Sequence, residues 1–287
     1  MRKLILACLI GAIVVLLAGA WIAGGQLTAA APATVGDPPT DLNVRPVQFP
    51  SQSGATIHGW FIPGQKGAGA VVLMHGVRAN RLSMVDRARF LSHAGYSILL
   101  FDFQAHGESD GRQITMGYLE SRDAQAAIEF LKANAPQENI GVIGVSMGGA
   151  ATLLASPPLP VKAMVLELVY PTIEEAIGDR LALRMGAWAS HLTPLVSLQL
   201  RPRLGVTAAA LRPIDQVDKI DAAKLFIAGA EDKHTTLAES QKMFAAANNP
   251  KEFWIVNGAG HVDVHKVAKE EYEQRVLTFF ARYLRQQ

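Results

Sequence analysis

The sequence predicts an α/β fold with a doubly wound, mostly parallel sheet. Short apolar runs recur along the chain, at residues 69–76, 96–103, 139–146, 161–169, 223–230 and 251–260. Nearly continuous apolar runs are typical of strands that are buried on both faces of a parallel sheet. Segments with helical spacing of apolar residues follow most of these runs, and alternating strands and helices define this fold class.

The composition agrees with a globular domain and excludes several classes of partner and site. The chain has 287 residues, of which 49% are hydrophobic and 18% charged, too apolar a balance for a disordered protein. Its net charge of +2, with no block of like charges, predicts no nucleic-acid partner. Cys8 is the only cysteine and lies near the N-terminus, so thiol nucleophiles, zinc–thiolate sites and iron–sulfur clusters are excluded beyond it.

The N-terminal segment has the pattern of an export or anchoring sequence. Arg2 and Lys3 precede an uncharged run over residues 4–23. A membrane-spanning helix needs about 20 apolar residues and a signal-peptide core about 7–15, so the run slightly favours an uncleaved anchor. Small residues nevertheless offer cleavage sites, for example after Ala30 or Ala33. We expect residues 1–33 to be a signal peptide or membrane anchor with its linker. Either alternative places the rest of the chain on the non-cytoplasmic side, with membrane contact if the segment is not cleaved.

The other elements follow in order within one domain, expected at residues 45–287. Residues 47–64 alternate between apolar and polar beyond a Ser53-Gly54 turn and predict a β-hairpin. The strands then alternate with helices, and Gly95 is the stop signal of the first helix. Helices are expected at residues 80–93, 116–134, 147–155, 236–246 and 262–284.

Residues 171–213 interrupt the alternation, because they contain a helical pattern without a strand. This segment is longer than a crossover helix requires and too apolar for a solvated loop. We therefore expect a small helical cap whose apolar face covers the neighbouring edge of the sheet. Met185 and Trp188 are the candidates for a substrate pocket, although either side chain could instead be buried between cap and core.

Ser146 lies in "GVSMGG", between the predicted strand 139–146 and the predicted helix 147–155. A strand–turn–helix with serine at its apex is a nucleophile elbow, and small neighbours such as Gly144 and Gly148 let strand and helix approach closely. The N–H of Met147 then points from the helix N-terminus toward the substrate oxygen, where it stabilises an oxyanion.

A serine nucleophile requires a base and an acid that orients the base. His261 follows the last predicted strand, and Asp232 follows the strand before it, so both are expected at the sheet edge that carries Ser146. The order serine, aspartate, histidine is the one used by folds with this elbow. Glu231 and Asp102 are the alternative acids, and Asp102 is more simply explained as a residue that holds the loop after its strand.

The remaining histidines are better explained by structural roles. We expect His75 to pack under the loop that follows the first buried strand, and His106 to bond within its own loop. His265 lies one helical turn after His261, and the pair suggests a metal site. Because no third ligand is evident, we expect His265 to be a surface residue and predict no metal site. His234 shows no signal of a role.

Several motifs resemble those of the α/β-hydrolase superfamily over about residues 45–285. "LMHG" is similar to its oxyanion motif, "FDFQAHGESDG" to its D-x-x-G-H-G-x-S loop, and "PIDQVDKI" to the segment before its acid strand. "AGAED" and "GAGH" are similar to its acid and histidine motifs. The motifs most resemble the branch that contains serine aminopeptidase-like and acyl-protein-thioesterase-like hydrolases. Gln104-Ala105 departs from the basic residue and glycine usual in the loop, which puts the loop geometry in doubt.

The resemblance implies the α/β-hydrolase fold, with Val77 as the second N–H donor to the oxyanion. It also implies acyl transfer to Ser146 without a cofactor. The apolar cap favours an ester or thioester of a small-molecule acyl substrate. A peptidase is the alternative, in which Glu174 or Glu175 would bind a substrate amine, although both residues also suit the start of a helix. A non-catalytic binding protein is the third possibility, and it would not need all three of Ser146, Asp232 and His261.

Overall fold

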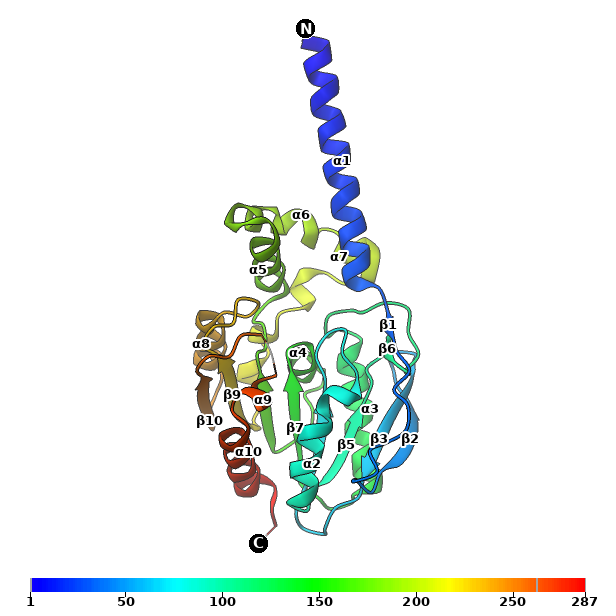
Figure 1. Cartoon of the computed structure of the whole chain (residues 1–287), viewed down its shortest axis with the longest axis vertical. Coiled ribbons are helices and arrows are strands. Elements are labelled where there is room, and N and C mark those ends of the chain that lie inside the picture. The colour runs from blue at the N-terminus through cyan, green and yellow to red at the C-terminus, as the bar shows by residue number, and fades with distance from the viewer. Residues whose placement is uncertain (1, 262, 287) are drawn as a thin grey trace.

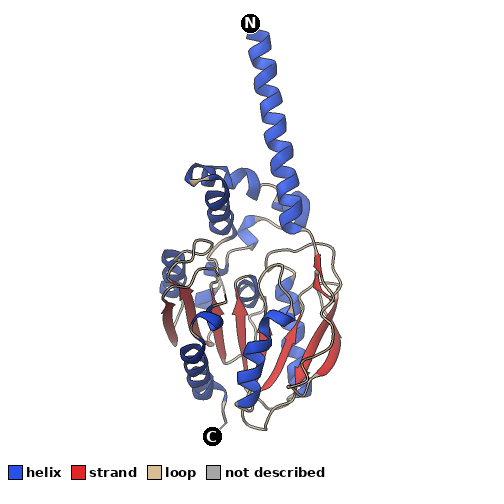
Figure 2. Ribbon diagram, in the orientation of Figure 1, coloured by secondary structure: helices blue, strands red, loops and turns tan. Residues whose placement is uncertain are grey.

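The computed structural model describes residues 2–261 and 263–286, and for part of the N-terminal helix it describes the backbone alone. Eight strands form the central sheet in the order β10-β9-β8-β7-β4-β5-β3-β2 (Figure 2). The strands are β2 (Arg45–Pro50), β3 (Thr56–Ile62), β4 (Ala70–Met74), β5 (Ser97–Phe101), β7 (Ile140–Val145), β8 (Ala163–Glu167), β9 (Ala223–Gly229) and β10 (Lys251–Val256). Only β3 is antiparallel to its neighbours, β2 and β5, and the other pairs are parallel, so the predicted mostly parallel sheet and the hairpin before it are confirmed.

Helices cover both faces of the sheet, and alternate residues of each central strand pack against opposite layers. In β4, Val72 and Met74 belong to the core beneath α3 (Glu120–Asn134), α4 (Met147–Leu154) and α8 (Leu237–Ala246). Val71 and Leu73 belong to the core beneath α2 (Val85–His93) and α10 (Lys269–Leu284). Burial on both sides explains why these strands are apolar at nearly every position.

Two predicted helices differ from the structure, one in where it begins and the other in being interrupted. The segment predicted as helix 116–134 becomes α3 only at Glu120, because Met116 and Gly117 have positive φ values of 54° and 101°. The segment predicted as helix 262–284 contains α9 (Val264–Val267) and α10, separated at Ala268, whose φ and ψ are −134° and 54°. Residue 262 lies outside the described residues. Local backbone conformation therefore interrupts a continuous helical pattern at both places.

The cap lies between β8 and β9 and is helical, as its sequence predicts. It contains α5 (Ile173–Met185), α6 (Thr193–Ser197) and α7 (Leu200–Leu204), with short 3-10 helices η2 (Ala187–Leu192), η3 (Ala208–Ala210), η4 (Pro213–Asp215) and η5 (Val217–Lys219) near them and toward β9. Another 3-10 turn, η1 (Arg81–Met84), precedes α2. Thr172 caps α5 by accepting the N–H of Glu175, and Figure 1 shows the cap helices at the end of the molecule toward which β7 points.

The N-terminal helix α1 (Arg2–Thr28) extends away from the domain, but its C-terminal end and the residues after it contact the domain (Figure 1). Strand β1 (Ala31–Pro32) pairs with β6 (His106–Gly107), and Arg78 Nη1 donates to the carbonyl of Gln26 at 3.0 Å. Ala30 and Ala33, which precede the predicted cleavage sites, flank the paired residues of β1. Among the described residues, no helix is found that is both long and apolar enough to cross a membrane. Export of the chain stays a prediction.

Candidate active site

Ser146 occupies a strained turn between β7 and α4. Its φ and ψ are 50° and −111°, a conformation that costs a residue with a side chain about 1–3 kcal/mol. Two neighbouring glycines make this turn possible. A Cβ atom on Gly144 would lie 2.6 Å from the Gly149 Cα atom, and one on Gly148 would lie 2.4 Å from the Met74 carbonyl oxygen. The turn therefore has the geometry of a nucleophile elbow, with the serine at the edge of the sheet.

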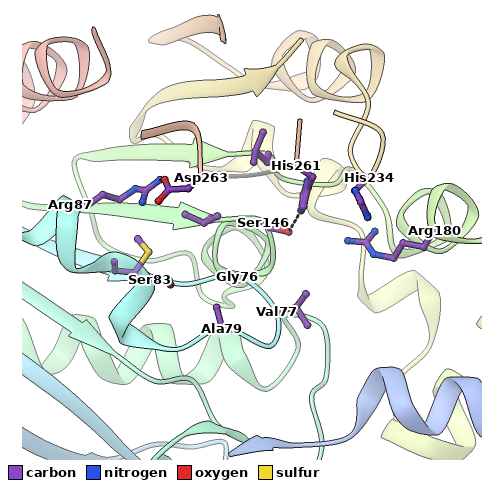
Figure 3. A pocket seen from close by; sticks show the side chains of 13 residues that line it. Gly76, Val77, Ala79, Ser83, Arg87, Ser146, Arg180, His234, His261 and Asp263 are labelled. Carbon is purple, nitrogen blue, oxygen red and sulfur yellow. Dashed lines mark hydrogen bonds and ion pairs between the residues drawn. The ribbon is translucent and has the colours of Figure 1, made fainter. Parts of the chain in front are cut away.

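The structure brings Ser146, His261 and Asp232 together in one hydrogen-bonded series, of which Figure 3 shows the contact between Ser146 and His261. The Ser146 Oγ lies 3.3 Å from His261 Nε2, and His261 Nδ1 lies 2.8 Å from Asp232 Oδ2. The other carboxylate oxygen, Oδ1, accepts the backbone N–H groups of His234 at 2.7 Å and Thr235 at 3.0 Å. The two backbone N–H groups thus hold the Asp232 carboxylate, and the carboxylate in turn orients the imidazole of His261. The alternative acid Glu231 is exposed and takes no part in the series.

Two buried histidines hold the loop that carries Gly76 and Val77. His75 Nδ1 donates to the carbonyl of Gly76 at 2.7 Å, and its Nε2 accepts the N–H of Phe103 at 3.1 Å. Complete burial lowers the pKa of His75 to about 3, so the ring is neutral and structural, as the sequence suggests. His106 Nε2 accepts the N–H of Arg78 at 3.0 Å, so it bonds the residue after Val77 as well as its own loop.

The loop that carries Val77 and the first residue of α4, Met147, both lie next to Ser146. Met147 is the first residue of α4, where backbone N–H groups have no partner within the helix. A Cβ atom built on Gly76 would lie 3.7 Å from the Ser146 Cβ atom, so the loop that continues to Val77 approaches the serine closely. Among the described residues, the N–H of Val77 donates to no protein acceptor. This arrangement agrees with two available donors beside the serine.

A cavity of about 390 Å³ opens beside Ser146. Its wall combines an apolar side with several charged or polar groups. The apolar side consists of Val77, Ala79, Met84, Val145 and Leu168, and the polar side includes Ser83, Arg87, Arg180, His234, His261 and Asp263. A volume near the lower end of the usual range for ligand sites, about 300–1,000 Å³, suits a small substrate.

A family model described as serine aminopeptidase, S33, matches residues 65–204 of the chain. The uncharacterized protein YqkD of Bacillus subtilis (strain 168) is 24% identical over 237 residues, which cover 80% of this chain and 77% of YqkD. The uncharacterized protein Rv2307c of Mycobacterium tuberculosis is 29% identical over 76% of this chain and 73% of its own length. The solved structure of the Pyrococcus furiosus esterase Pf2001 has a TM-score of 0.73 at 24% identity and covers 89% of this chain and 98% of the esterase.

These likenesses show the α/β-hydrolase fold and support a hydrolase of that superfamily.

The loop that departs from the usual superfamily motif is accommodated by local bonds. Ala105, at the position where glycine is usual, has a positive φ of 58°. Gln104 replaces the usual basic residue, and its Nε2 donates to Glu120 Oε1 at 2.8 Å and to the carbonyl of Gln113 at 2.7 Å. The alternative acid Asp102 accepts the backbone N–H groups of Arg81 and Glu108, at 2.7 and 3.0 Å. Asp102 therefore holds the loop, in agreement with the structural role expected for it.

A buried ion-pair network, which no pattern in the sequence indicates, joins the elbow to the loop that carries His261. Arg87 of α2 donates to both oxygens of Glu167, at 3.1 and 2.6 Å, and to Asp263 Oδ1 at 2.8 Å. Glu167 also accepts the N–H of Ser146 through its backbone carbonyl at 2.7 Å. Because Asp263 lies two residues after His261, Arg87 links the positions of the serine and the histidine.

Replacing Arg87 with methionine is expected to lower the free energy of unfolding by about 3–5 kcal/mol, because it leaves the buried Glu167 carboxylate unpaired. The double variant Arg87→Met/Glu167→Gln should recover a substantial part of this loss, since no uncompensated charge remains. Urea unfolding of the wild type and both variants measures the effect. A loss below about 1 kcal/mol in Arg87→Met, or no recovery in the double variant, would contradict the role assigned to the pair.

Two carboxylates lie side by side where the cap meets α8: Asp179 of α5 and Glu239 of α8. Burial, together with the Glu239 carboxylate, raises the pKa of Asp179 from 3.8 to about 7. The folded chain therefore binds this proton more tightly than the unfolded chain. The resulting cost to stability is absent below pH 3.8, grows as the pH rises toward 7, and is complete above it.

Asp179→Asn is accordingly expected to raise the Tm at pH 8 and to leave it unchanged at pH 3.5. The increase should be about 1–3 °C, because solvent screens this partly exposed carboxylate. The exposed Asp218 serves as the control, and Asp218→Asn should have the same small effect at both pH values. Thermal unfolding followed by circular dichroism tests the difference, and equal Tm changes for Asp179→Asn at both pH values would contradict it.

Three side chains, Met185, Trp188 and His265, do not lie where the sequence predicts them. Met185 and Trp188 are 47% and 59% exposed and are absent from the cavity wall, so the expected pocket residues are corrected. The residue of α5 that lines the cavity is Arg180, one and a half turns before Met185 on a different face of the helix. His265 is 2% exposed rather than a surface residue, because its ring stacks on Phe90.

Proposed function

We propose that this α/β-hydrolase cleaves small carboxylic esters through an acyl-enzyme intermediate on Ser146. The observation that carries the proposal is the series Ser146–His261–Asp232 at the wall of a small cavity. His261 Nε2 accepts the serine proton as Ser146 Oγ attacks the carbonyl carbon of the ester. The carbonyl oxygen becomes an oxyanion, which accepts hydrogen bonds from the N–H groups of Val77 and Met147.

The second half of the reaction uses the same groups. His261 returns the proton to the leaving alcohol oxygen, and the acyl group stays bonded to Ser146 Oγ. A water molecule then gives a proton to His261 and attacks the acyl carbon. The tetrahedral intermediate collapses, Ser146 Oγ regains the proton, and the carboxylic acid leaves. Asp232 keeps the imidazole in the tautomer that accepts a proton at Nε2 and stabilises the imidazolium formed in each step.

The charges near the site favour an ester over a peptide with a free amine. Glu175 already accepts hydrogen bonds from two side chains. The Thr172 hydroxyl donates to its Oε2, and Lys242 Nζ donates to its Oε1 at 2.7 Å. Glu174 lies 4.0 Å from Arg212, and neither glutamate lines the cavity. The cationic Arg180 does line it. A substrate ammonium group would thus meet a guanidinium instead of a free carboxylate.

The peptidase alternative is supported by the description of the matching family model as serine aminopeptidase. Ester hydrolysis is supported by solved structures of the same fold that are described as esterases, among them Pf2001 and an esterase domain of a Rhodothermus marinus protein, which has a TM-score of 0.60 at 21% identity and covers 84% of this chain and 99% of that domain. Thioesters require the same groups and are the second substrate class within the proposal.

A fluorophosphonate probe tests the nucleophile directly. The wild type should be labelled at Ser146 alone, labelling should disappear in Ser146→Ala, and it should fall strongly in His261→Ala. The Ser83→Ala variant is the matched control, because Ser83 lines the same cavity and should not affect labelling. Equal labelling of Ser146→Ala and wild type would reject the proposed nucleophile, and no labelling of the wild type would favour a non-catalytic binding protein.

Substrate class is tested by comparing p-nitrophenyl esters and the corresponding thioesters with aminoacyl p-nitroanilides. We expect ester hydrolysis to exceed anilide hydrolysis in kcat/KM. Rapid anilide cleavage that requires a free substrate amine would instead support the peptidase.

We also propose that the chain is exported, with the catalytic domain on the non-cytoplasmic side. Support comes from Arg2 and Lys3 before the uncharged residues 4–23, which form a part of α1. Alkaline phosphatase fused to the C-terminal end should be active in cells, because this reporter requires an oxidising compartment. An inactive fusion that is present at normal levels would contradict export.

A further inference from the structure

Arg180 lies in the wall of the cavity that contains Ser146, and it has no ion-pair partner among the described residues. Figure 3 shows its side chain extending from α5 toward His234 and Ser146. Its Nη1 donates to the carbonyl of Ala176 at 2.8 Å, within its own helix. The carboxylates of Asp179, Asp232 and Glu239 act on Arg180 at longer range, and among the described residues none of them forms an ion pair with it.

The other charged groups of the cavity wall are already paired. Arg87 is bonded to Glu167 and Asp263, so that network offers neither a free cation nor a free anion. Asp232, which orients His261 and is not itself part of the wall, is bonded to His261 and to two backbone N–H groups. Burial and the nearby His261 and Arg180 lower the pKa of His234, so its ring is neutral at neutral pH. Arg180 therefore supplies a positive charge that nothing in the described wall neutralises.

A guanidinium in this position is costly unless a ligand pairs with it. Burial lowers the pKa of Arg180, which reflects the loss of hydration around its charge. Arginine presents several N–H donors in a planar arrangement that matches a carboxylate, and such charged hydrogen bonds are stronger than neutral ones. The same cavity has an apolar side formed by residues such as Val77, Ala79 and Leu168. This combination fits a short aliphatic or aromatic group that ends in an anion.

We propose that Arg180 is a specificity-determining residue that binds a carboxylate on the substrate, so that the enzyme prefers anionic esters to neutral ones. This inference rests on the proposed ester hydrolysis and names its substrate class. The carboxylate belongs either to the acyl part, as in a hemiester of a short dicarboxylic acid, or to the leaving alcohol. Both alternatives use the same chemistry at Arg180, and the cavity of about 390 Å³ accommodates a short chain of either kind.

The kinetic test compares matched substrates with and without the charge. The p-nitrophenyl hemiester of glutaric acid is compared with the methyl ester of the same compound, and 4-acetoxybenzoate is compared with its methyl ester. The first pair has the carboxylate in the acyl part, and the second has it in the leaving group. For at least one pair, the wild type should favour the anionic member in kcat/KM by about tenfold or more, as expected for a charged hydrogen bond.

Arg180→Met keeps most of the side-chain length and removes the charge, so it should abolish this preference while it changes kcat/KM for the neutral members less than threefold. Arg180→Lys should retain part of the preference. Arg201→Met is the matched control, because Arg201 is an exposed arginine of the same cap that is not in the cavity wall, and it should leave the preference unchanged. Equal losses on neutral and anionic esters in Arg180→Met, or a wild type that prefers neutral esters, would overturn the proposal.

A binding measurement separates failure of this inference from failure of the proposed reaction. Binding of two carboxylates, monomethyl glutarate and 4-hydroxybenzoate, is measured by calorimetry on the Ser146→Ala variant. This variant cannot hydrolyse an ester. Binding of either carboxylate to Ser146→Ala that is lost in Ser146→Ala/Arg180→Met supports the role of Arg180 even if no ester is hydrolysed. Binding of equal strength to both proteins, or to neither, counts against that role even if neutral esters are hydrolysed rapidly.

Discussion

Replacing Ser146 with alanine is expected to lower kcat for ester hydrolysis by about 10⁶-fold, the size of the loss when the serine of a protease triad is removed. Alanine has no nucleophilic oxygen, and the donors at Val77 and Met147 remain to provide only residual catalysis. The fold should be unaffected, because alanine tolerates the φ of 50° at this turn about as well as serine does. Initial rates with a p-nitrophenyl ester measure the loss, and unfolding curves check that stability changes by less than about 1 kcal/mol.

His261→Ala should cause a loss of similar size, and the double variant Ser146→Ala/His261→Ala should be no worse than either single variant. The two side chains act on one proton transfer, so their effects are not additive. Additive losses in the double variant, or more than about 1% of wild-type activity in Ser146→Ala, would contradict the assignment of these residues as nucleophile and base.

Asp232→Asn is expected to lower kcat by about 10⁴-fold while the protein remains folded, by analogy with a serine protease in which the same change gives the wrong histidine tautomer. The structure supplies the reason. Asp232 Oδ1 accepts two backbone N–H groups, from His234 and Thr235. The amide oxygen of asparagine must occupy this position, so its NH₂ group faces His261 Nδ1. The imidazole then carries its proton on Nε2 and cannot accept the proton of Ser146.

Asp102→Asn is the informative control, since Asp102 also follows a buried strand. Its oxygens accept from Arg81 and Glu108, and it has no bond to His261. We expect the variant to lose stability through the weakened pairing with Arg81, and to keep kcat within about tenfold of wild type at temperatures where it is folded. A 10⁴-fold loss in Asp102→Asn together with near-normal activity in Asp232→Asn would reverse the assignment of the acid.

The strand and helix pattern could be predicted largely from local sequence, because the buried parallel strands are apolar at nearly every position and helices repeat their apolar residues at a different spacing. The elbow at Ser146 was also visible locally, in the glycines that a close strand–helix contact requires. The predicted helix at 262–284 was wrong in detail, because its apolar spacing continues through Ala268, whose φ and ψ of −134° and 54° lie outside the helical region. Periodicity indicates which face of a helix is buried, and it does not show where a helix is interrupted.

Cap residues illustrate a different limit. Met185 and Trp188 were expected in the pocket because large apolar side chains are usually buried, yet both are exposed on the cap. Arg180 and His234, which do line the cavity, gave no recognisable pattern in the sequence. A single charged residue in a helical sequence predicts a solvent-exposed side chain. Only the packing of α5 over the sheet edge places Arg180 in the cavity wall.

The sequence by itself determined the sheet, the elbow and the order of Ser146, Asp232 and His261, because each of these depends on residues that are neighbours along the chain or on the ends of recognisable strands. The tertiary structure alone decided which distant groups meet. Arg87 lies 80 residues from Glu167 and 176 residues from Asp263, and no local pattern relates them. The pairing of a buried charge depends on distances between separate elements, and these distances exist only once the helices have packed against both faces of the sheet.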